Sequence, residues 1–487
     1  MFADYVYEKS AAKYARKILL IDADRLLDNT QFTDSFKEHG FEIVVYRDDL
    51  SFRIEYEEKI KYEQGRIAVV VTPEQYVPYD LRQRLTSYSV SLAEMFPRLN
   101  TAVLRERSAE TYDLVSSAYE RTYDKYQSIA ETEKFIRLQA YSMENIRHNL
   151  EKSFQDLLRQ SEECTSYKKW FNIADEKARI DRFSAEYEIA LDTTEINLRF
   201  RDYILKHYGK LSTSMDRESP VLVSKAMEFM HEHSKKFIVI VMDGMSEFDW
   251  RIMSKSFNGV HYQHTAVFAM IPTVTSVSRQ CLLSNKYPRE LESPWTQSKE
   301  KQEFIACAKN MGFTNNQISY QRGYDADFSA LICCGAVIIN DIDDMVHGQK
   351  QGRIGMFNDI SVMTKQKKLV NMTRRLLMAG FDVYITADHG NTTRRGMGKL
   401  MSAGVETETK SRCMLVLRKF ADKDGMKEKH GMLEFPKTYL PKEYDYLICD
   451  VGDSFDVKGE EVMSHGGISI DECVVPFIKI KAVENNG

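Results

Sequence analysis

Residues 237–244 read FIVIVMDG, an uninterrupted apolar run that ends at Asp243 and Gly244. Six apolar residues rich in β-branched side chains, followed by a turn signal, predict a strand that is buried on both faces. The Asp-Gly pair favours a tight turn, so this strand would deliver a carboxylate at its carboxyl end. One such turn is more often structural than functional, and its meaning depends on the neighbouring segments.

Two other apolar runs end in the same way. Residues 336–340 (AVIIN) precede Asp341, Asp343, Asp344 and His347, and residues 381–386 (FDVYIT) lead through Ala387 to Asp388, His389 and Gly390. Open parallel sheets bind ligands beyond the carboxyl ends of their strands. The three runs therefore predict acids and imidazoles gathered at one edge of a parallel sheet.

Histidine spacing adds to this pattern. Asp343 and His347 are four residues apart, which on a helix places a carboxylate and an imidazole on one face. His465 stands in Ser464-His465-Gly466-Gly467, a turn whose glycines let backbone approach a site closely. A lone histidine is usually a plain polar residue, but three of the eleven histidines lie beside acidic strand ends or glycine turns. This coincidence favours a metal site.

A hydroxyl nucleophile is available in residues 270–279 (MIPTVTSVSR), which read as a strand end and a proline turn entering a helix. At a helix N-terminus the free amides and the dipole favour an anionic phosphate near a threonine hydroxyl. Thr273 and Thr275 are both candidates, and helix capping is the alternative for each. Arg279 lies one turn beyond Thr275, from where it could fork onto phosphate oxygens.

The candidate ligands are too numerous for one four-coordinate ion. Two divalent cations about 3.5–4 Å apart would use them and would clamp the attacking and leaving oxygens of a phosphoryl displacement. A set of Asp and His without Cys favours Zn²⁺, with Mn²⁺ as the second choice. We therefore predict a two-metal phosphoryl hydrolase with seven candidate ligands: Asp243, Asp343, His347, Asp388, His389, His465 and one of the two threonines, Thr273 or Thr275.

Composition is that of a soluble globular protein, with 43% hydrophobic and 29% charged residues in 487. The net charge of -5 gives no general attraction to nucleic acid or anionic membrane. The first residues lack the apolar core of a signal peptide and no run is long enough to span a bilayer. Eight cysteines without a C-x-x-C pair favour reduced thiols. We expect a cytoplasmic protein with no membrane partner.

Three regions are expected along the chain. Residues 1–96 contain β-branched runs at 18–21, 43–46 and 67–71, which predict a small α/β domain with a parallel sheet. Residues 97–219 form a linking region predicted to be helical, because between Pro97 and Pro220 there is no proline and the only glycine is Gly209. Residues 220–487 alternate apolar runs and amphipathic stretches, which predicts a second α/β domain.

Within the linking region, aromatic and apolar residues recur at steps of three and four. This spacing predicts one face of a helix, formed by Tyr112, Val115, Tyr119, Tyr123 and Tyr126. Packing on neighbouring helices explains such a stripe better than base stacking does.

A response-regulator receiver is an alternative for residues 1–96, because Asp22 and Asp24 follow the first run. The third run ends in Thr72-Pro73-Glu74, with no aspartate where a receiver places its phosphoacceptor. A scaffold or partner-docking domain is therefore preferred, and a signalling output function is correspondingly weakened.

The order Asp-Gly, Pro-Thr-x-Thr, Asp-x-x-x-His, Asp-His-Gly and His-Gly-Gly resembles the alkaline phosphatase superfamily. The segments IPTVTSVSR, VIINDIDDMVH, YITADHG and SHGGISIDECVVPFIKI resemble the PglZ domain of bacterial BREX phage-defence systems, over roughly residues 220–487. The resemblance implies an α/β chain: an alkaline-phosphatase-like catalytic domain with a mostly parallel sheet, preceded by a small α/β domain and a helical middle region.

The resemblance also implies how the residues divide between two metals. One metal would be surrounded by Asp243, Thr275, Asp388 and His389, and the other by Asp343, His347 and His465. Thr275 is preferred over Thr273 because the phosphodiesterase branch uses the second threonine of Pro-Thr-x-Thr. Asp343 is preferred over Asp341 and Asp344 because only Asp343 is four residues from His347. Residues 472–476 resemble a structural strand with no direct catalytic part.

Departures from related families refine the substrate. Alkaline phosphatases and phosphoglycerate mutases use serine where this chain has Thr275, and threonine favours a diester. Cys281 stands in SRQCLL, which departs from the sulfatase pattern. The expected function is a metal-dependent phosphodiesterase or phosphatase of a BREX-type defence system, with Thr275 as nucleophile.

The alternative function is a weakly catalytic or non-catalytic scaffold that docks partners such as a BREX methyltransferase, and the long helical middle favours it. A nucleotide or nucleic acid is one substrate to consider, because basic residues flank the expected site in sequence: Lys365–Lys368, Arg374, Arg375, Arg394 and Arg395. Solvated faces explain such runs more often. Homo-oligomerisation is left open.

Overall fold

The chain forms two compact units, Met1–Ser153 and Phe154–Gly487, in a computed structural model. The structure describes residues 2–10, 12–105, 107–214, 216–398, 409, 411–418 and 423–482. The division between the units falls inside helix α8 (Met143–Ser161), so the expected helical region 97–219 is shared between them. Domain limits at residues 96 and 219 stay a prediction.

The first unit contains a four-stranded parallel sheet in the order β2-β3-β1-β4. Its strands are β1 (Lys17–Asp22), β2 (Phe41–Val45), β3 (Arg66–Val71) and β4 (Thr86–Val90). The three apolar runs predicted from the sequence lie in β1, β2 and β3. Strand β4 was not foreseen, because its sequence TSYSV is polar at the three exposed positions of this edge strand.

Short helices surround this sheet. They are α1 (Phe2–Lys9), α2 (Asp34–Glu38), α3 (Asp49–Lys61), α4 (Tyr79–Arg82), α5 (Leu92–Met95), α6 (Ala109–Glu120) and α7 (Ile129–Phe135). The predicted aromatic face is only partly right. Tyr112, Val115 and Tyr119 are buried on α6, but the helix ends at Glu120 and leaves Tyr123 90% exposed.

The second unit is built on a six-stranded sheet in the order β6-β16-β9-β5-β8-β7. Its strands are β5 (Phe237–Met242), β6 (Gln263–Phe268), β7 (Ile318–Arg322), β8 (Cys334–Ile339), β9 (Asp382–Thr386) and β16 (Val474–Ile480). Strand β16 runs antiparallel to both its neighbours, whereas β9, β5, β8 and β7 pair in parallel. The predicted mostly parallel sheet is confirmed.

Strand β5 occupies the centre of this sheet. It pairs with β8 on one side and β9 on the other, and all six of its residues are buried. This is the environment that a continuous apolar run requires, because both faces of the strand are covered. The carboxyl ends of β5, β8 and β9 consequently reach the same edge of the sheet.

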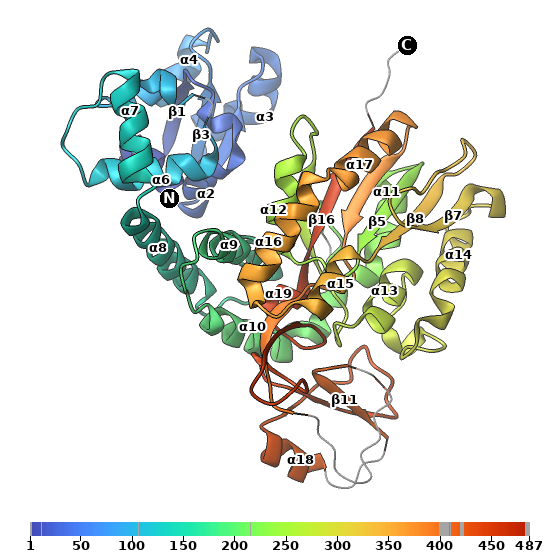
Figure 1. Ribbon diagram of the computed structural model, residues 1–487. Coiled ribbons are helices and arrows are strands. Elements are labelled where there is room, and N and C mark those ends of the chain that lie inside the picture. The colour runs from blue at the N-terminus through green and yellow to red at the C-terminus, as the bar shows by residue number, and fades with distance from the viewer. Residues whose placement is uncertain are drawn as a thin grey trace. The chain divides into compact units, whose positions relative to one another are not determined.

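Helices cover the sheet and support that edge; α17 packs against β9 and α14 against β7 (Figure 1). The helices are α9 (Tyr167–Glu186), α10 (Thr194–His207), α11 (Ala226–His233), α12 (Glu247–Met253), α13 (Thr275–Ser284), α14 (Glu300–Asn310), α15 (Asp341–Gly348), α16 (Gly352–Lys365), α17 (Lys368–Met378), α18 (Lys423–His430) and α19 (Ile470–Cys473). No helix in the described ranges is both long and apolar enough to cross a membrane.

Two three-stranded sheets complete the second unit. Their strands are β10 (Thr392–Gly396), β14 (Asp453–Ser454) and β15 (Glu461–Ser464), and β11 (Met414–Leu417), β12 (Leu433–Glu434) and β13 (Asp445–Ile448). Figure 1 draws β11 and α18 below α13 and α15.

Candidate active site

Three of the predicted ligands stand directly after two central strands. Asp243 follows β5, and Asp388 and His389 follow β9 after Ala387; all three residues are at most 3% exposed. Gly244 has a φ of 74°, a left-handed conformation that residues with a Cβ rarely adopt, and an added Cβ would lie at an ordinary contact distance of 3.4 Å from the Asp343 Cβ. A glycine is therefore needed where the turn after β5 meets α15.

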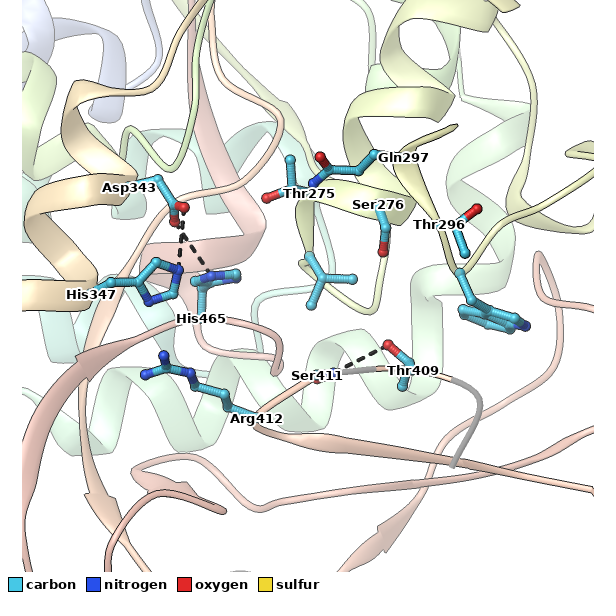
Figure 2. A pocket seen from close by; sticks show the side chains of 12 residues that line it. Thr275, Ser276, Thr296, Gln297, Asp343, His347, Thr409, Ser411, Arg412 and His465 are labelled. Atoms are coloured by element: carbon cyan, nitrogen blue, oxygen red, sulfur yellow. Dashed lines mark hydrogen bonds and ion pairs between the residues drawn. The ribbon is translucent and has the colours of Figure 1, made fainter. Parts of the chain in front are cut away.

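Asp343 and His347 lie one turn apart on the same face of α15, as the four-residue spacing predicts. His347 Nε2 is 3.3 Å from Asp343 Oδ2. His465 follows β15, and its Nε2 is 3.5 Å from Asp343 Oδ1 (Figure 2). The ring of His465 also stacks on His389, with centroids 4.2 Å apart.

Thr275 is the first residue of α13, at the amino end of the helix. Its Oγ1 lies 3.4 Å from Asp243 Oδ1 and 3.2 Å from His389 Nε2. Thr273, the other candidate, faces away from these groups. Its hydroxyl donates to Glu472 Oε2 at 2.9 Å and lies 3.1 Å from the Gly467 carbonyl oxygen, so of the two threonines Thr275 presents its hydroxyl to the candidate ligands.

The side chains fit divalent cations in two groups. Ligand atoms of Asp243, Asp388 and His389 lie within 4.8 Å of one another, and so do those of Asp343, His389 and His465. Asp388 Oδ2 and Asp343 Oδ1 are buried and accept no hydrogen bond from any described residue. A buried acceptor without a donor costs about 1–3 kcal/mol, which a bound cation would offset. One such oxygen lies in each group.

In the first group, two buried carboxyl groups lie close enough to repel each other when both are ionised. Burial, and then the charge of Asp243, raise the pKa of Asp388 to about 7. Burial acts to lower the pKa of His389, but the charges of Asp388 and Asp243 outweigh it and raise that pKa. Two adjacent buried carboxylates do not readily ionise together, so this group favours a cation.

In the second group, Asp343 is anionic and His465 is neutral. Burial acts to raise the pKa of Asp343, but the hydrogen bond from His347 and the charges of His465 and His389 hold it below its usual value. Burial and the nearby His389 lower the pKa of His465 to about 4. His465 is therefore a neutral imidazole at pH 7, the form that coordinates metals.

Arg279 occupies a different place from the one expected. It is 1% exposed, its Nε donates to Glu300 Oε2 at 2.7 Å, and its Nη1 donates to Asp243 Oδ2 at 2.5 Å. The expectation that Arg279 forks onto phosphate oxygens is at odds with this position. Its guanidinium forms ion pairs with two buried acids, Glu300 and Asp243, and so fixes the position of the Asp243 carboxylate.

Replacement of Arg279 by alanine should destabilise the chelator-treated protein by about 3–5 kcal/mol, because Glu300 and Asp243 would lose their buried counter-charge. Urea unfolding of wild type and variant measures the difference. Arg279→Lys, which keeps the charge but not the fork, should lose less. A loss under about 1 kcal/mol for Arg279→Ala would contradict this role.

A cavity of about 540 Å³ opens beside these groups. Figure 2 shows Thr275, Asp343, His347 and His465 facing it, with Arg412 beside the two histidines. Its lining consists of Val274, Thr275, Ser276, Trp295, Thr296, Gln297, Asp343, His347, Thr409, Ser411, Arg412 and His465. Among these described lining residues Arg412 is the one permanent cation, and its Nη1 is 3.2 Å from Asp456 Oδ1.

Arg412 was missed in the sequence, because Ser411-Arg412 belongs to none of the motifs and reaches the site only through folding. Ser411 Oγ donates to the Gly466 carbonyl at 3.3 Å and Cys413 Sγ lies 3.5 Å from the His465 carbonyl, which anchors this segment to the histidine turn. The basic residues named from the sequence, Lys365–Lys368, Arg374, Arg375, Arg394 and Arg395, do not line the described cavity.

A family model described as the BREX system PglZ alkaline phosphatase-like domain matches residues 221–480, more than half of the chain. This chain belongs to the PglZ family. The resemblance of its motifs to that family is thereby confirmed. No curated protein matches the PglZ chain.

Solved structures are similar to the PglZ chain at a distance. Murine and human ectonucleotide pyrophosphatase/phosphodiesterase 5 share 14% identity, each match covers 50% of this chain and 88% or 87% of theirs, and the TM-scores are 0.36 and 0.37. Phosphonoacetate hydrolase from Sinorhizobium meliloti 1021 shares 11% identity over 52% of this chain and 92% of its own, with a TM-score of 0.30.

Proposed function

We propose that this PglZ chain is a two-metal phosphodiesterase of a bacterial BREX-type phage-defence system. The observation that carries the proposal is the position of the Thr275 hydroxyl, 3.4 Å from Asp243 and 3.2 Å from His389, beside a cavity and at the amino end of α13. A helix N-terminus favours a phosphate group at this hydroxyl.

One metal would be held by Asp243, Thr275, Asp388 and His389, and the other by Asp343, His347 and His465, with His389 close to both. Zn²⁺ suits the imidazoles, and Mn²⁺ is the second choice. Bound divalent cations supply Lewis acidity and neutralise charge on phosphoryl and leaving oxygens.

The reaction would proceed in two displacements at phosphorus. The Thr275 Oγ would form a bond to phosphorus while the ester bond to the first alcohol breaks, leaving a phosphothreonine diester. Water would then attack the same phosphorus, and the bond to Thr275 Oγ would break to release the phosphomonoester. Arg412, which lines the cavity, would contact a non-bridging oxygen of the substrate.

The cavity has room for a diester with large substituents. A second cavity, about 390 Å³, shares Trp295 and Thr296 with the first and is also lined by Arg289 and Tyr444. A large substituent on the phosphate bound in the first cavity could extend past Trp295 into the second cavity. This arrangement favours a diester such as a nucleotide or a nucleic-acid strand over a small monoester.

Turnover of bis-p-nitrophenyl phosphate and of p-nitrophenyl phosphate by the Zn²⁺- and Mn²⁺-loaded protein tests the proposal. We expect the diester to be cleaved with the higher kcat/KM, and a chelator to abolish turnover. Undiminished turnover after chelation, or cleavage of the monoester alone, would overturn it.

Arg412→Ala should raise KM for the diester about 10-fold with little change in kcat, because a charged hydrogen bond to bound substrate is lost. Steady-state kinetics measures both constants. Arg374→Ala is the matched control, since Arg374 donates to the Asn258 carbonyl and does not line the cavity. Equal KM for the two variants would contradict the assignment.

A docking scaffold is the second candidate, and the first unit provides an observation in its favour. Edge strand β2 and helix α3 border a cavity of about 420 Å³, and nearby Val45, Leu50 and Ile54 are 60%, 71% and 76% exposed. A partner such as a BREX methyltransferase could dock here. Co-elution of such a partner with Asp243→Ala, undiminished from wild type, would show docking independent of the metal site.

A further inference from the structure

Glu472, in helix α19, is a fully buried acid with an unusually large set of hydrogen bonds. Its Oε2 accepts from Thr273 Oγ1 at 2.9 Å and from the Gly467 N–H at 2.8 Å. Its Oε1 accepts from the N–H and the hydroxyl of Ser469, both at 2.9 Å, and from Arg394 Nη2. The side chain is 0% exposed and does not line the cavity, so Glu472 acts behind the site.

These bonds join the three turns that carry the site. Thr273 precedes Thr275 by two residues, and Gly467 follows His465 by two. The backbone carbonyl of Glu472 accepts from the Gly390 N–H at 3.0 Å, next to His389. One residue therefore contacts the nucleophile turn and both histidine turns.

The turns are also bonded to each other through Thr273. The Gly466 N–H donates to Thr273 Oγ1 at 3.0 Å, and His465 Nδ1 lies 2.9 Å from the Thr273 carbonyl. A proton on Nδ1 donated to this carbonyl leaves the Nε2 lone pair directed at the Asp343 side. Glu472, by fixing Thr273, therefore sets the orientation of His465.

The packing around Glu472 leaves no space for a side chain on the neighbouring glycines. A Cβ on Gly467 would lie 2.2 Å from Arg394 Nη2, and a Cβ on Gly390 would lie 2.1 Å from the Asp471 carbonyl oxygen. Both glycines are required because the backbone comes this close to α19 and its ion pair. A change at Glu472 is consequently transmitted to the turns.

We propose that Glu472 is a positioning residue. By accepting hydrogen bonds from the turns that carry Thr275, His465 and His389, it fixes the positions of these three side chains relative to one another. The proposal rests on the proposed function and extends it. Glutamine has the same shape but only one acceptor oxygen, and its amide N–H₂ would face donors. An acid is therefore specified, in a role that agrees with the expectation that residues 472–476 take no direct part in catalysis.

The test compares Glu472→Gln with a matched control, Asp382→Asn. Asp382 accepts from Ser234 Oγ at 2.7 Å and Lys481 Nζ at 2.6 Å, at the amino end of β9, the end opposite to the site. Each variant is dialysed against limiting Zn²⁺, and bound metal, Tm, kcat and KM are measured.

We expect Glu472→Gln to retain about half the Zn²⁺ of wild type and to lose kcat roughly 10–100-fold with KM within about 2-fold. Asp382→Asn should lower Tm but keep metal content and kcat. Wild-type metal content and kcat in Glu472→Gln would overturn the proposal, and so would losses in the two variants that simply follow Tm.

Thr273→Val keeps the test decisive if Glu472→Gln does not fold. This change leaves the Glu472–Arg394 pair in place and removes the hydroxyl that bonds Glu472 and Gly466. A similar, smaller loss of Zn²⁺ and kcat supports the proposal, and unchanged values overturn it. The amount of bound Zn²⁺ tests the role of Glu472 without any need for catalytic turnover. A wild-type protein without activity would therefore contradict the proposed function but not the positioning role of Glu472.

Discussion

Thr275→Ala should lower kcat for bis-p-nitrophenyl phosphate by roughly 10³-fold or more, because in the proposed mechanism the Thr275 oxygen forms the bond to phosphorus. Thr275 Oγ1 is the hydroxyl adjacent to Asp243 and His389 in the described structure, whereas the Thr273 hydroxyl is directed to Glu472. Steady-state and single-turnover kinetics measure the loss.

The serine variant separates the hydroxyl from the side-chain shape. Thr275→Ser keeps a nucleophilic oxygen and should retain activity within about 10-fold of wild type. Mass spectrometry of quenched wild-type reactions should detect a phosphorylated peptide containing Thr275, and none in Thr275→Ala. Equal turnover by wild type and Thr275→Ala would exclude Thr275 as the nucleophile.

His389→Ala should have the second large effect, loss of bound metal from both groups. His389 is the one residue common to the groups Asp243-Asp388-His389 and Asp343-His389-His465 in the described chain. Its removal also leaves Asp388 and Asp243 without the imidazole charge that offsets their repulsion. Elemental analysis after gel filtration should find well under one Zn²⁺ per chain, and turnover should fall at least 10³-fold.

His347→Ala is the comparison for this prediction. His347 contacts Asp343 from the rim of the cavity, its side chain is 38% exposed, and it belongs to neither close group. We expect it to weaken one metal and to leave the other bound. Equal metal loss in the two histidine variants would contradict the shared position of His389.

The positions of the candidate ligands at the strand ends could be predicted from the sequence alone, because these positions follow from local pattern. Continuous apolar runs specify buried parallel strands, and the carboxyl ends of such strands meet at one edge. Asp243, Asp388 and His389 needed nothing more, and the helical spacing of Asp343 and His347 added that pair. Thr275 and His465 needed the family resemblance, since a threonine after proline and a histidine in a glycine turn have common structural uses.

One residue was expected in a different position and another was missed, and both for the same physical reason: long-range contacts decide where a side chain points. Arg279 was expected to face a phosphate from its position one turn beyond Thr275, but Asp243 and Glu300 bind its guanidinium from other elements. Arg412 reaches the cavity because Ser411 bonds to Gly466, 55 residues away in sequence. No local pattern encodes either contact.

Helix ends and edge strands were also underdetermined. The spacing of Tyr123 continues the periodicity of α6, yet the helix stops at Glu120 and Arg121 serves as its C-cap. From the sequence, Glu472 was assigned to a structural strand. Its hydrogen bonds to Thr273 and Arg394, which lie far from it in sequence, and to Gly467 could not be predicted from the local pattern.

The central claim, a pair of metals held by these two groups, is tested most directly by anomalous diffraction at the zinc edge from crystals of the Zn²⁺-loaded protein. The account predicts two separate peaks, one bounded by Asp243, Thr275, Asp388 and His389 and the other by Asp343, His347 and His465. A single peak, or peaks that none of these side chains contacts, would contradict it.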